Sequence, residues 1–458
     1  MNHLLHSSFM VISALLLTAP LLTGIGQAAE DEKPNPLRFY QGENNSFLQA
    51  SVGLEFAFFN QGNAWFGNDT GVLAGETIDS WWESLVRLGL AGNHTLPNTQ
   101  SVYAKVDAVQ ANTFGGIDVG GTNAAHGDVS SLRIDKAYAG WRSGNLFHSL
   151  GEDFLDVSFG RQIYAVGNGF LFNGEGEGGY KRAAWYIGGR KSADWAGIVR
   201  MKSGPWSGDL FYFEADRIND FDAEHFTDTN TRAGGTTMNY AFNDAARIGG
   251  SLVAIASDAE GRDGMHVYDL RGDIKPFDRA SAPEGLKPLK FEGEYAHEDR
   301  DGDFANGNGW YIATSYQFGT VPWQPELTYR YASFDERYDP LFYGATDWGT
   351  WFQGEIIGEY DLGSNNLDTH MVRLKAQPLE SLTVSLFYFN YTLHQPEAYG
   401  VITDDYANEW DLIFDWVATD HLTLALVGAY ATPDDGAKQL HGGTDDWTAL
   451  MLYGCLKF

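Results

Sequence analysis

A strand pattern at the end of the chain constrains the fold more than any other feature. Within residues 446–458, one face of an extended strand carries Leu450, Leu452, Leu456 and the terminal Phe458. The opposite face is mixed and holds Trp, Ala, Met, Tyr and Lys. An apolar face that ends on a terminal aromatic residue is typical of the closing strand of an outer-membrane β-barrel. A strand of a soluble sandwich is the alternative interpretation.

The start of the chain has the pattern of an export signal. Residues 11–25 form an apolar run, and small residues around Ala28 precede an abrupt acidic start to the next segment. This pattern predicts a cleaved signal peptide over 1–29, although no Lys or Arg precedes the apolar run. The run is short and interrupted by Pro and Gly, so it is a poor spanning helix. We therefore expect residues 30–458 to form one exported domain, either soluble or a barrel.

The composition agrees with a barrel. The chain has 54 Gly, 14 Trp, 23 Tyr and 29 Phe, which suits tight turns and aromatic girdles at the membrane interfaces. Its mean hydropathy is only −0.29, as expected where alternate residues face water. A single Cys excludes an internal disulfide and a Cys-based zinc site. The net charge of −31 disfavours nucleic-acid binding, which relies on Lys and Arg against phosphate.

Alternating hydrophobicity predicts 18 strands. Nine are expected to run one way, near 49–59, 101–110, 155–163, 207–216, 246–256, 288–298, 324–334, 380–391 and 421–431. Nine are expected to return, near 83–92, 130–142, 194–202, 235–242, 264–275, 309–318, 367–377, 408–418 and 446–458. The connections alternate between short turns and long loops, as in bacterial barrels. We expect an all-β fold: a single 18-stranded antiparallel transmembrane β-barrel in the bacterial outer membrane, with periplasmic termini, short periplasmic turns and long extracellular loops.

Three of the expected strands do not keep a clean phase. In 130–142 the apolar face changes side, and a β-bulge near Asp135 and Lys136 would reconcile its two halves. In 155–163, Arg161 faces inward only if the phase slips near Gly160. In 207–216 two apolar faces compete.

Charged residues are unevenly divided between the two faces. With apolar residues placed outward, 12 of the 30 basic residues point inward: Arg87, Lys105, Arg200, Lys202, Arg247, Arg271, Lys275, Lys290, Arg330, Arg373, Lys375 and Lys457. Only 11 of the 61 acids do so: Glu55, Glu83, Asp107, Asp156, Asp269, Asp273, Glu292, Glu294, Glu298, Asp411 and Asp415. Arg133 joins the basic set. Charge of either sign avoids lipid, but the basic excess predicts an electropositive pore that favours anions, with interspersed acids preventing tight retention.

Three segments resemble the alginate-export family of outer-membrane porins. They are Asp156–Gln162 with its Gly-Arg-Gln, Asp194–Arg200 leading to Asp209–Phe213, and Asp339–Trp351 followed by Phe352–Tyr360. The third is the most distinctive, because Gly-Arg-Gln alone is a weak motif. The resemblance covers most of the mature chain and implies an 18-stranded barrel with an electropositive passage for a polyuronate. Arg161 matches the arginine of the Gly-Arg-Gln motif.

The resemblance also implies gating by loops and passage without an energy source. The long outer loops 164–193 and 335–366 are the candidate gates, and glycines give such loops conformational freedom. The candidate gating residues are Gly174, Gly176, Lys181, Arg182, Asp339, Trp348 and Trp351. Purely protective loops are the alternative. The expected partners are an alginate-like polysaccharide, outer-membrane lipid and lipopolysaccharide, and periplasmic export or biosynthesis proteins, with the barrel itself a monomer.

Other motifs carry less weight. Asp299, Asp301 and Asp303 could bind Ca²⁺, but the spacing of an EF-hand is absent and a solvated loop is favoured. No other cofactor or metal motif is present in the sequence. The adjacent acids 335–336 and 404–405 would diverge on extended strands, so we do not expect an enzyme.

The sequence therefore predicts an outer-membrane channel that exports alginate or a related anionic exopolysaccharide through a basic, loop-gated lumen. An uptake porin for small anionic sugars or oligouronates is the alternative, since both need basic walls. A plugged structural or adhesion barrel is a third class.

Overall fold

The computed structural model describes residues 37–42, 44–68, 80–119, 127–176, 179–218, 228–259, 261–279, 281–300, 305–344 and 352–458. Four predicted features lie outside these residues. They are the signal peptide at 1–29, Asp301 and Asp303 of the calcium motif, and the gating candidates Trp348 and Trp351.

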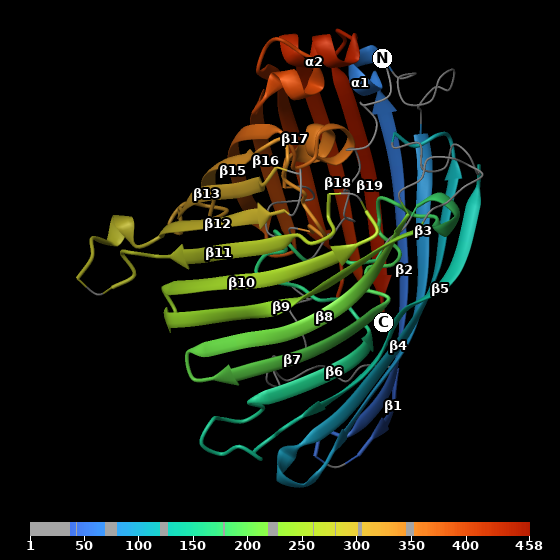
Figure 1. Ribbon diagram of the computed structural model, residues 1–458, viewed down its shortest axis with the longest axis vertical. Coiled ribbons are helices and arrows are strands. Elements are labelled where there is room, and N and C mark those ends of the chain that lie inside the picture. Colours follow the sequence, from blue (N-terminus) through green and yellow to red (C-terminus); the bar gives the residue numbers. More distant parts are fainter. Residues whose placement is uncertain are drawn as a thin grey trace.

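Eighteen antiparallel strands form a closed barrel, as predicted (Figure 1). The first nine are β2 (Phe47–Gly62), β3 (Ser80–Thr95), β4 (Ser101–Gly115), β5 (Val129–Arg142), β6 (Leu155–Arg161), β7 (Trp195–Ser203), β8 (Trp206–Ile218), β9 (Asp228–Asn243) and β10 (Ala246–Ser257). The others are β11 (His266–Ile274), β12 (Leu289–Asp299), β13 (Gly307–Gln317), β14 (Glu326–Phe334), β15 (Leu367–Leu379), β16 (Leu382–Leu393), β17 (Asp405–Val417), β18 (Leu422–Pro433) and β19 (Trp447–Lys457). Each strand pairs with the next, and β19 pairs with β2 to close the ring.

A short additional strand and a few helices complete the described fold. Strand β1 (Arg38–Gln41) pairs with the start of β2, on the edge that β19 occupies further along. The helical segments are α1 (Ala64–Gly67), η1 (Pro97–Thr99), η2 (Tyr180–Arg182), η3 (Glu284–Leu286), η4 (Gly354–Asp361, a π-helix), η5 (Pro396–Tyr399) and α2 (Asp435–His441). Helices α1 and α2 lie together at one end of the barrel, which we call the loop end (Figure 1). No helix among the described residues has the length and apolar character needed to cross a membrane.

The predicted outward faces are correct. Leu450 and Leu452 of β19 are exposed on the outside, whereas Trp447 and Met451 on the other face are buried. Ile312, at 57% exposure, lies near the middle of β13 on the same outer surface. A continuous apolar outer surface on a closed barrel is the surface that lipid chains cover.

The structure resolves the three uncertain phases. In β5 the ladder pairs Asp107 with Lys136 and then Ala108 with Ile134, so Asp135 is the extra residue of the predicted bulge. In β8, Leu210 and Tyr212 face outward, and their neighbours Phe211 and Phe213 are buried inside.

The third uncertain phase concerns β6, where Gly160 has a φ of +125°. This left-handed value favours glycine and breaks the regular strand just before Arg161. Arg161 then pairs with Asp194 at 2.5 Å, between its guanidinium and the carboxylate. The phase slip that the sequence required is therefore present.

Short turns gather at the end opposite the helices, which we call the turn end. The turn after β7 holds only Gly204 and Pro205, and the turn after β9 holds Asp244 and Ala245. The long connection 275–288 between β11 and β12 projects away from the barrel at this end (Figure 1).

A charge placed on the outer surface should destabilise the barrel according to its depth. Ile312→Arg puts a guanidinium at mid-strand and should cost ~2–4 kcal/mol, whereas Phe318→Arg, just past the end of β13, should cost ~0–1 kcal/mol. Denaturant unfolding of the refolded barrel in lipid vesicles would measure both values. Equal losses at the two positions would contradict the assignment of this surface to lipid.

Candidate functional site

The loop that joins β6 to β7, residues 162–194, folds inward and crosses the barrel; we call it the first inward loop. At its far side the backbone N–H of Ala184 donates to Thr113 Oγ1 on β4 at 2.7 Å. At another point the side chain of Asn168 donates to Tyr311 Oη on β13 at 2.8 Å. Because β4 and β13 are nine strands apart in the ring, the loop spans the lumen. Its segment Phe170–Phe172 is fully buried.

The loop that joins β14 to β15, residues 335–366, also folds inward; we call it the second inward loop. It carries the π-helix η4, whose residues from Gly354 to Tyr360 are all buried. Tyr360 contacts Tyr186 of the first inward loop, with ring centroids 5.3 Å apart, and also packs near Trp447 of β19. The interior of the barrel is therefore filled largely by its own loops.

The two inward loops are joined to each other through their backbones. Phe172 and Phe342 form an isolated parallel β-bridge, and the N–H of Asn173 donates to the Phe342 carbonyl at 2.9 Å. The N–H of Gly344 donates to the Gly169 carbonyl at 2.9 Å. A Cβ at Gly169 would lie 2.5 Å from the Gly344 oxygen, so this close approach requires glycine. We call this contact the loop clasp.

Buried carboxylates on the barrel wall hold the inward loops in place. Glu83 on β3 accepts the backbone N–H groups of Tyr186 and Ile187 at 3.2 and 2.8 Å. Glu409 on β17 accepts those of Ile356 and Ile357 at 2.7 and 2.9 Å. Charge-assisted hydrogen bonds of this kind are stronger than neutral ones.

Two further wall acids act in the same way. Asp135, the bulge residue, accepts the N–H groups of Lys191 and Ser192, and Asp411 accepts that of Glu355. The sequence assigned Asp411 to pore lining and assigned the inward acids the task of moderating retention of a polyanion. Asp411 does face inward, but its structural task is to hold a loop.

Six of the predicted basic lumen residues form ion pairs with wall acids. The pairs are Arg87 with Asp135, Lys105 with Asp107, Arg247 with Asp273, Arg271 with Asp269, Lys290 with Glu292, and Arg373 with Glu326. Several other members face an opposite charge or a polar group: Arg200 lies opposite Asp156 and Asp209, Glu294 opposite Arg271, Lys375 attracts Asp415, and Glu55 accepts the Tyr453 hydroxyl. These parts of the wall are therefore charge-compensated, whereas the sequence predicted an electropositive pore with interspersed acids.

Arg330 differs most from its predicted role. It points inward from β14, but its side chain is 0% exposed. The guanidinium donates to the carbonyl of Phe352 and, at 3.1 Å, to Gln353 Oε1. It also lies over the Phe352 ring, 3.7 Å from its centroid. Arg330 therefore fastens the second inward loop and does not offer its charge to a solute.

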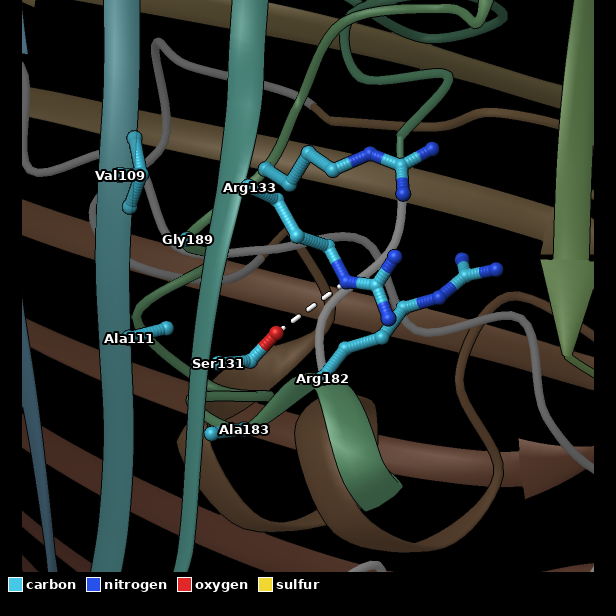
Figure 2. A pocket seen from close by; sticks show the side chains of 8 residues that line it. Val109, Ala111, Ser131, Arg133, Arg182, Ala183 and Gly189 are labelled. Carbon is cyan, nitrogen blue, oxygen red and sulfur yellow. Dashed lines mark hydrogen bonds between the residues drawn. The ribbon is translucent and has the colours of Figure 1, made fainter.

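A small cavity with arginines along one side lies between the wall and the first inward loop (Figure 2). It has room for about one water molecule, with a volume of about 10 Å³. Val109, Ala111 and Ala183 form its apolar part, and the side chains of Arg133 and Arg182 extend to the same side of the strands. Arg190 also lines it, a residue that the strand pattern could not identify because it lies in a loop. Among the predicted residues, Arg133 and Arg182 are thus brought together.

The other gating candidates have defined places. The N–H of Gly176 donates to the Lys191 carbonyl at 3.0 Å, and a Cβ there would lie 2.6 Å from the Arg190 oxygen. This glycine thus allows close packing of the loop against itself, a different task from the freedom to move that the sequence indicated. Gly174 begins the same segment, with a φ of +157°, and Lys181 is the middle residue of the short helix η2, beside Arg182.

Asp339 fastens the second inward loop at the loop end. It forms a bidentate ion pair with Arg262 at 2.6 and 2.7 Å, and its N–H donates to Glu298 at 2.9 Å. The connection between β10 and β11 and the strand β12 are thereby tied to this loop.

The predicted calcium motif receives no support from its described part. Asp299 ends β12, and the rest of the motif lies outside the described residues except for Arg300, which pairs with Glu298. Among the described residues no group of three or more His, Cys, Asp or Glu side chains is arranged to hold a metal ion.

Comparisons with known proteins identify the fold and leave the family open. No protein-family model matches the sequence, and no curated protein matches it, so the resemblance to the alginate-export family is not supported. Solved structures do match. OprD of Pseudomonas aeruginosa has a TM-score of 0.57 at 12% identity, over 90% of this chain and 95% of that chain. OccAB1 of Acinetobacter baumannii has a TM-score of 0.57 at 14% identity, over 90% of this chain and 97% of that chain. Similarity at this identity establishes the barrel fold.

Removing a wall carboxylate should loosen the loop that it holds. Glu409→Ala deletes the acceptor for two backbone amides, each bond to a charged group being worth ~1.5–3 kcal/mol. Amide hydrogen exchange of a peptide covering 352–362 should become roughly 10- to 100-fold faster. Asp415→Ala is the matched control, since Asp415 lies on the same face of β17 and interacts with Lys375. Unchanged exchange in Glu409→Ala would refute the anchoring role.

Docking of the first inward loop should weaken at alkaline pH. Glu175 is buried and accepts the Tyr164 N–H at 3.1 Å, and burial raises the pKa of its carboxyl to about 8. The docked loop thus binds the proton more tightly than a solvated loop, so docking is strongest below the ordinary carboxyl pKa. It is lost progressively as the pH rises towards 8. Exchange rates of peptide 164–176, corrected for intrinsic pH dependence, should rise over this range. Glu175→Gln should flatten the profile.

Proposed function

We propose that this chain is an outer-membrane channel through which small anionic solutes diffuse. The observation that carries the proposal is the interior: a closed barrel whose bore is crossed by two fastened loops, one of which brings arginines to the wall. A lipid-facing exterior around a charged interior is the arrangement of a membrane pore.

The comparisons favour uptake over polysaccharide export. OprD and OccAB1, which share the fold, are outer-membrane porins. Export of alginate was the first interpretation of the sequence, and its support came from a family resemblance that no family model bears out. The alternative was an uptake porin for small anionic sugars or oligouronates, and we now propose that interpretation, widened to small anionic solutes.

The fastened loops also argue against passage of a polymer. The first inward loop is held at β3, β4 and β5, and the second at β17, with the loop clasp between them. A continuous polysaccharide chain would have to displace this whole assembly, including the buried aromatic residues that fill the space around it. A small solute would require less displacement of this assembly than a polymer.

Selection for anions would rest on the few basic groups that remain accessible. Arg133 and Lys202 are exposed on the inner face, and Arg247 is 66% exposed near the turn end. Charge in a narrow pore lowers the free energy of the opposite ion, and paired acids nearby keep each site weak enough to release it. A series of such weak anion-binding sites allows a net flux of anions through the pore.

The remaining assignments follow from the same proposal. The barrel would act as a monomer with both termini in the periplasm, after removal of residues 1–29. The turn end would then face the periplasm and the loop end the exterior, in line with the short-turn and long-loop asymmetry of bacterial barrels.

Removing accessible basic charges should reduce anion selectivity. The variant Arg133→Gln, Lys202→Gln and Arg247→Gln removes three positive charges from the inner face. At about 4–8 Å in a water-like medium each charge is worth ~0.5–1 kcal/mol, or about two- to sixfold in permeability ratio. Reversal potentials in a KCl gradient across a planar bilayer would measure the change.

The control removes charge away from the lumen. Arg279→Gln and Lys287→Gln lie in the projecting connection 275–288 and should leave selectivity unchanged (Figure 1). Cation selectivity of the unaltered protein, or no current at all, would overturn the proposed function.

A further inference from the structure

We infer that one proton, shared between the carboxyl groups of Glu409 and Asp411, holds the second inward loop in the barrel, and that the loop is released as the pH rises. We call these two groups the carboxyl pair. Release of the loop widens the passage, and this consequence for conductance rests on the proposed function. The docking of the loop does not rest on it and can be measured without any solute.

The two carboxyl groups are in direct contact inside the barrel. Glu409 and Asp411 lie two residues apart on β17, so they share its inner face, where they are 0% and 2% exposed. Their side chains hydrogen-bond to each other. Ionised carboxylates have only acceptor atoms, so such a bond exists only when one of the two groups carries a proton. Repulsion between two adjacent negative charges also opposes ionisation of both groups.

The other hydrogen bonds show which of the two groups carries the proton. Among the described residues, no N–H or hydroxyl group donates to the buried Oδ1 of Asp411. Its Oδ2 accepts the backbone N–H of Glu355 at 3.2 Å. The two oxygens of Glu409 accept two loop amides, at 2.7 and 2.9 Å, and Oε2 also accepts the Tyr391 hydroxyl at 3.1 Å. This division of partners assigns the proton to Asp411 and the negative charge to Glu409.

The backbone of the second inward loop packs directly on the carboxyl pair. Gly354 begins η4 with a φ of +98°, a left-handed value that favours glycine. A Cβ at this position would lie 2.8 Å from Glu409 Oε1. Loss of the proton while the loop is docked therefore leaves two adjacent carboxylates buried, which is costly. Release of the loop brings both groups into water, where each charge is stabilised.

Other titratable and charged groups surround the carboxyl pair. They are Glu355, Glu359 and Tyr360 on η4, Tyr391 on β16, Glu83 on β3 and Arg330 on β14. The guanidinium of Arg330 is directed to the loop itself, since it donates to the Phe352 carbonyl and to Gln353 Oε1. Within the described part of the chain, neither group of the carboxyl pair forms an ion pair with a basic residue.

Two groups of the loop act in the same direction as the carboxyl pair. Burial, followed by the charge of Glu355, raises the pKa of the Glu359 carboxyl well above its ordinary range. At the end of η4, Asp361 lies 3.0 Å from Nε2 of His441 on α2, and this contact is an ion pair only when the imidazole is protonated. In both cases the docked loop keeps a proton that the released loop gives up.

The direction of the pH dependence follows from this difference in bound protons. Since the docked loop binds protons more tightly than the released loop, docking is strongest below the ordinary carboxyl pKa of about 4. It weakens progressively as the pH rises above that range.

Hydrogen exchange of peptide 352–362 in the refolded full-length barrel tests the inference. Between about pH 5 and about pH 9, exchange corrected for its intrinsic pH dependence should become at least roughly tenfold faster, the change expected for one proton bound more tightly by one pKa unit. Asp411→Asn keeps a donor for Glu409 and an acceptor for the Glu355 amide without a charge. At about pH 9 this variant should exchange at least roughly tenfold slower than the unaltered protein. A merely structural role for Asp411 would make the variant exchange faster.

Two further variants complete the test. Asp415→Asn, on the same face of β17, is the matched control and should leave the pH profile unchanged. Glu409→Gln also removes the shared proton, so its profile should be flatter than that of the unaltered protein, and it replaces Asp411→Asn if that variant fails to fold.

The outcomes separate the shared proton from the channel function. Equal exchange of the unaltered protein at both pH values would overturn the inference and keep the proposed function. So would an Asp411→Asn variant that exchanges as fast as the unaltered protein at alkaline pH. Single-channel conductance should rise over the same pH range, and a constant conductance would overturn the widening of the passage. Absence of any current would overturn the channel function and leave the exchange result to decide on the shared proton.

Discussion

The hydrogen bond from a loop amide to a buried wall carboxylate is the interaction on which the interior depends. Long loops can enter a barrel only if their backbone polar groups find partners there, because an unsatisfied buried amide is costly. Glu83, Asp135, Glu409 and Asp411 provide those partners on three strands, β3, β5 and β17. Each carboxylate in turn has its charge offset by amide dipoles, so the two buried groups stabilise one another.

These anchors decide how wide the channel is. A bare barrel of this strand number would enclose a broad aqueous bore, whereas here the aromatic residues of two loops occupy much of it. The loop clasp makes the two loops one body, since displacing either must break the backbone bonds between them. Arg330 and Asp339 add further fixed points on the second inward loop. Permeation through the proposed channel would therefore be controlled by these two buried loops.

The sequence predicted the wall well because a barrel strand has a local, period-two signature. It identified the closing strand, the number of strands and even the bulge at Asp135, since a change of phase is visible in neighbouring residues. The sequence did not predict that the two long loops fold into the barrel, because these loops contact strands that are distant in sequence. One signal was available: Phe170–Phe172 and Ala183–Ile187 are too apolar for solvated loops. The sequence correctly predicted that these acids face the interior. It could not predict whether an inward acid would bind a solute or the backbone amides of a loop.

The bulge in β5 has a consequence for how the interior is specified. Alternation counted forward from Ile134 places position 135 inside, whereas alternation counted back from Ala137 would place it outside. The bulge reconciles the two halves and keeps the Asp135 carboxylate inside, where it meets Arg87 and the amides of Lys191 and Ser192. A local irregularity of the wall thus fixes the position of a loop that lies far along the chain. Removing one residue at this point would make the strand pairing more regular and would delete one of the anchors of the first inward loop. The position of this loop therefore depends on the least regular part of the wall.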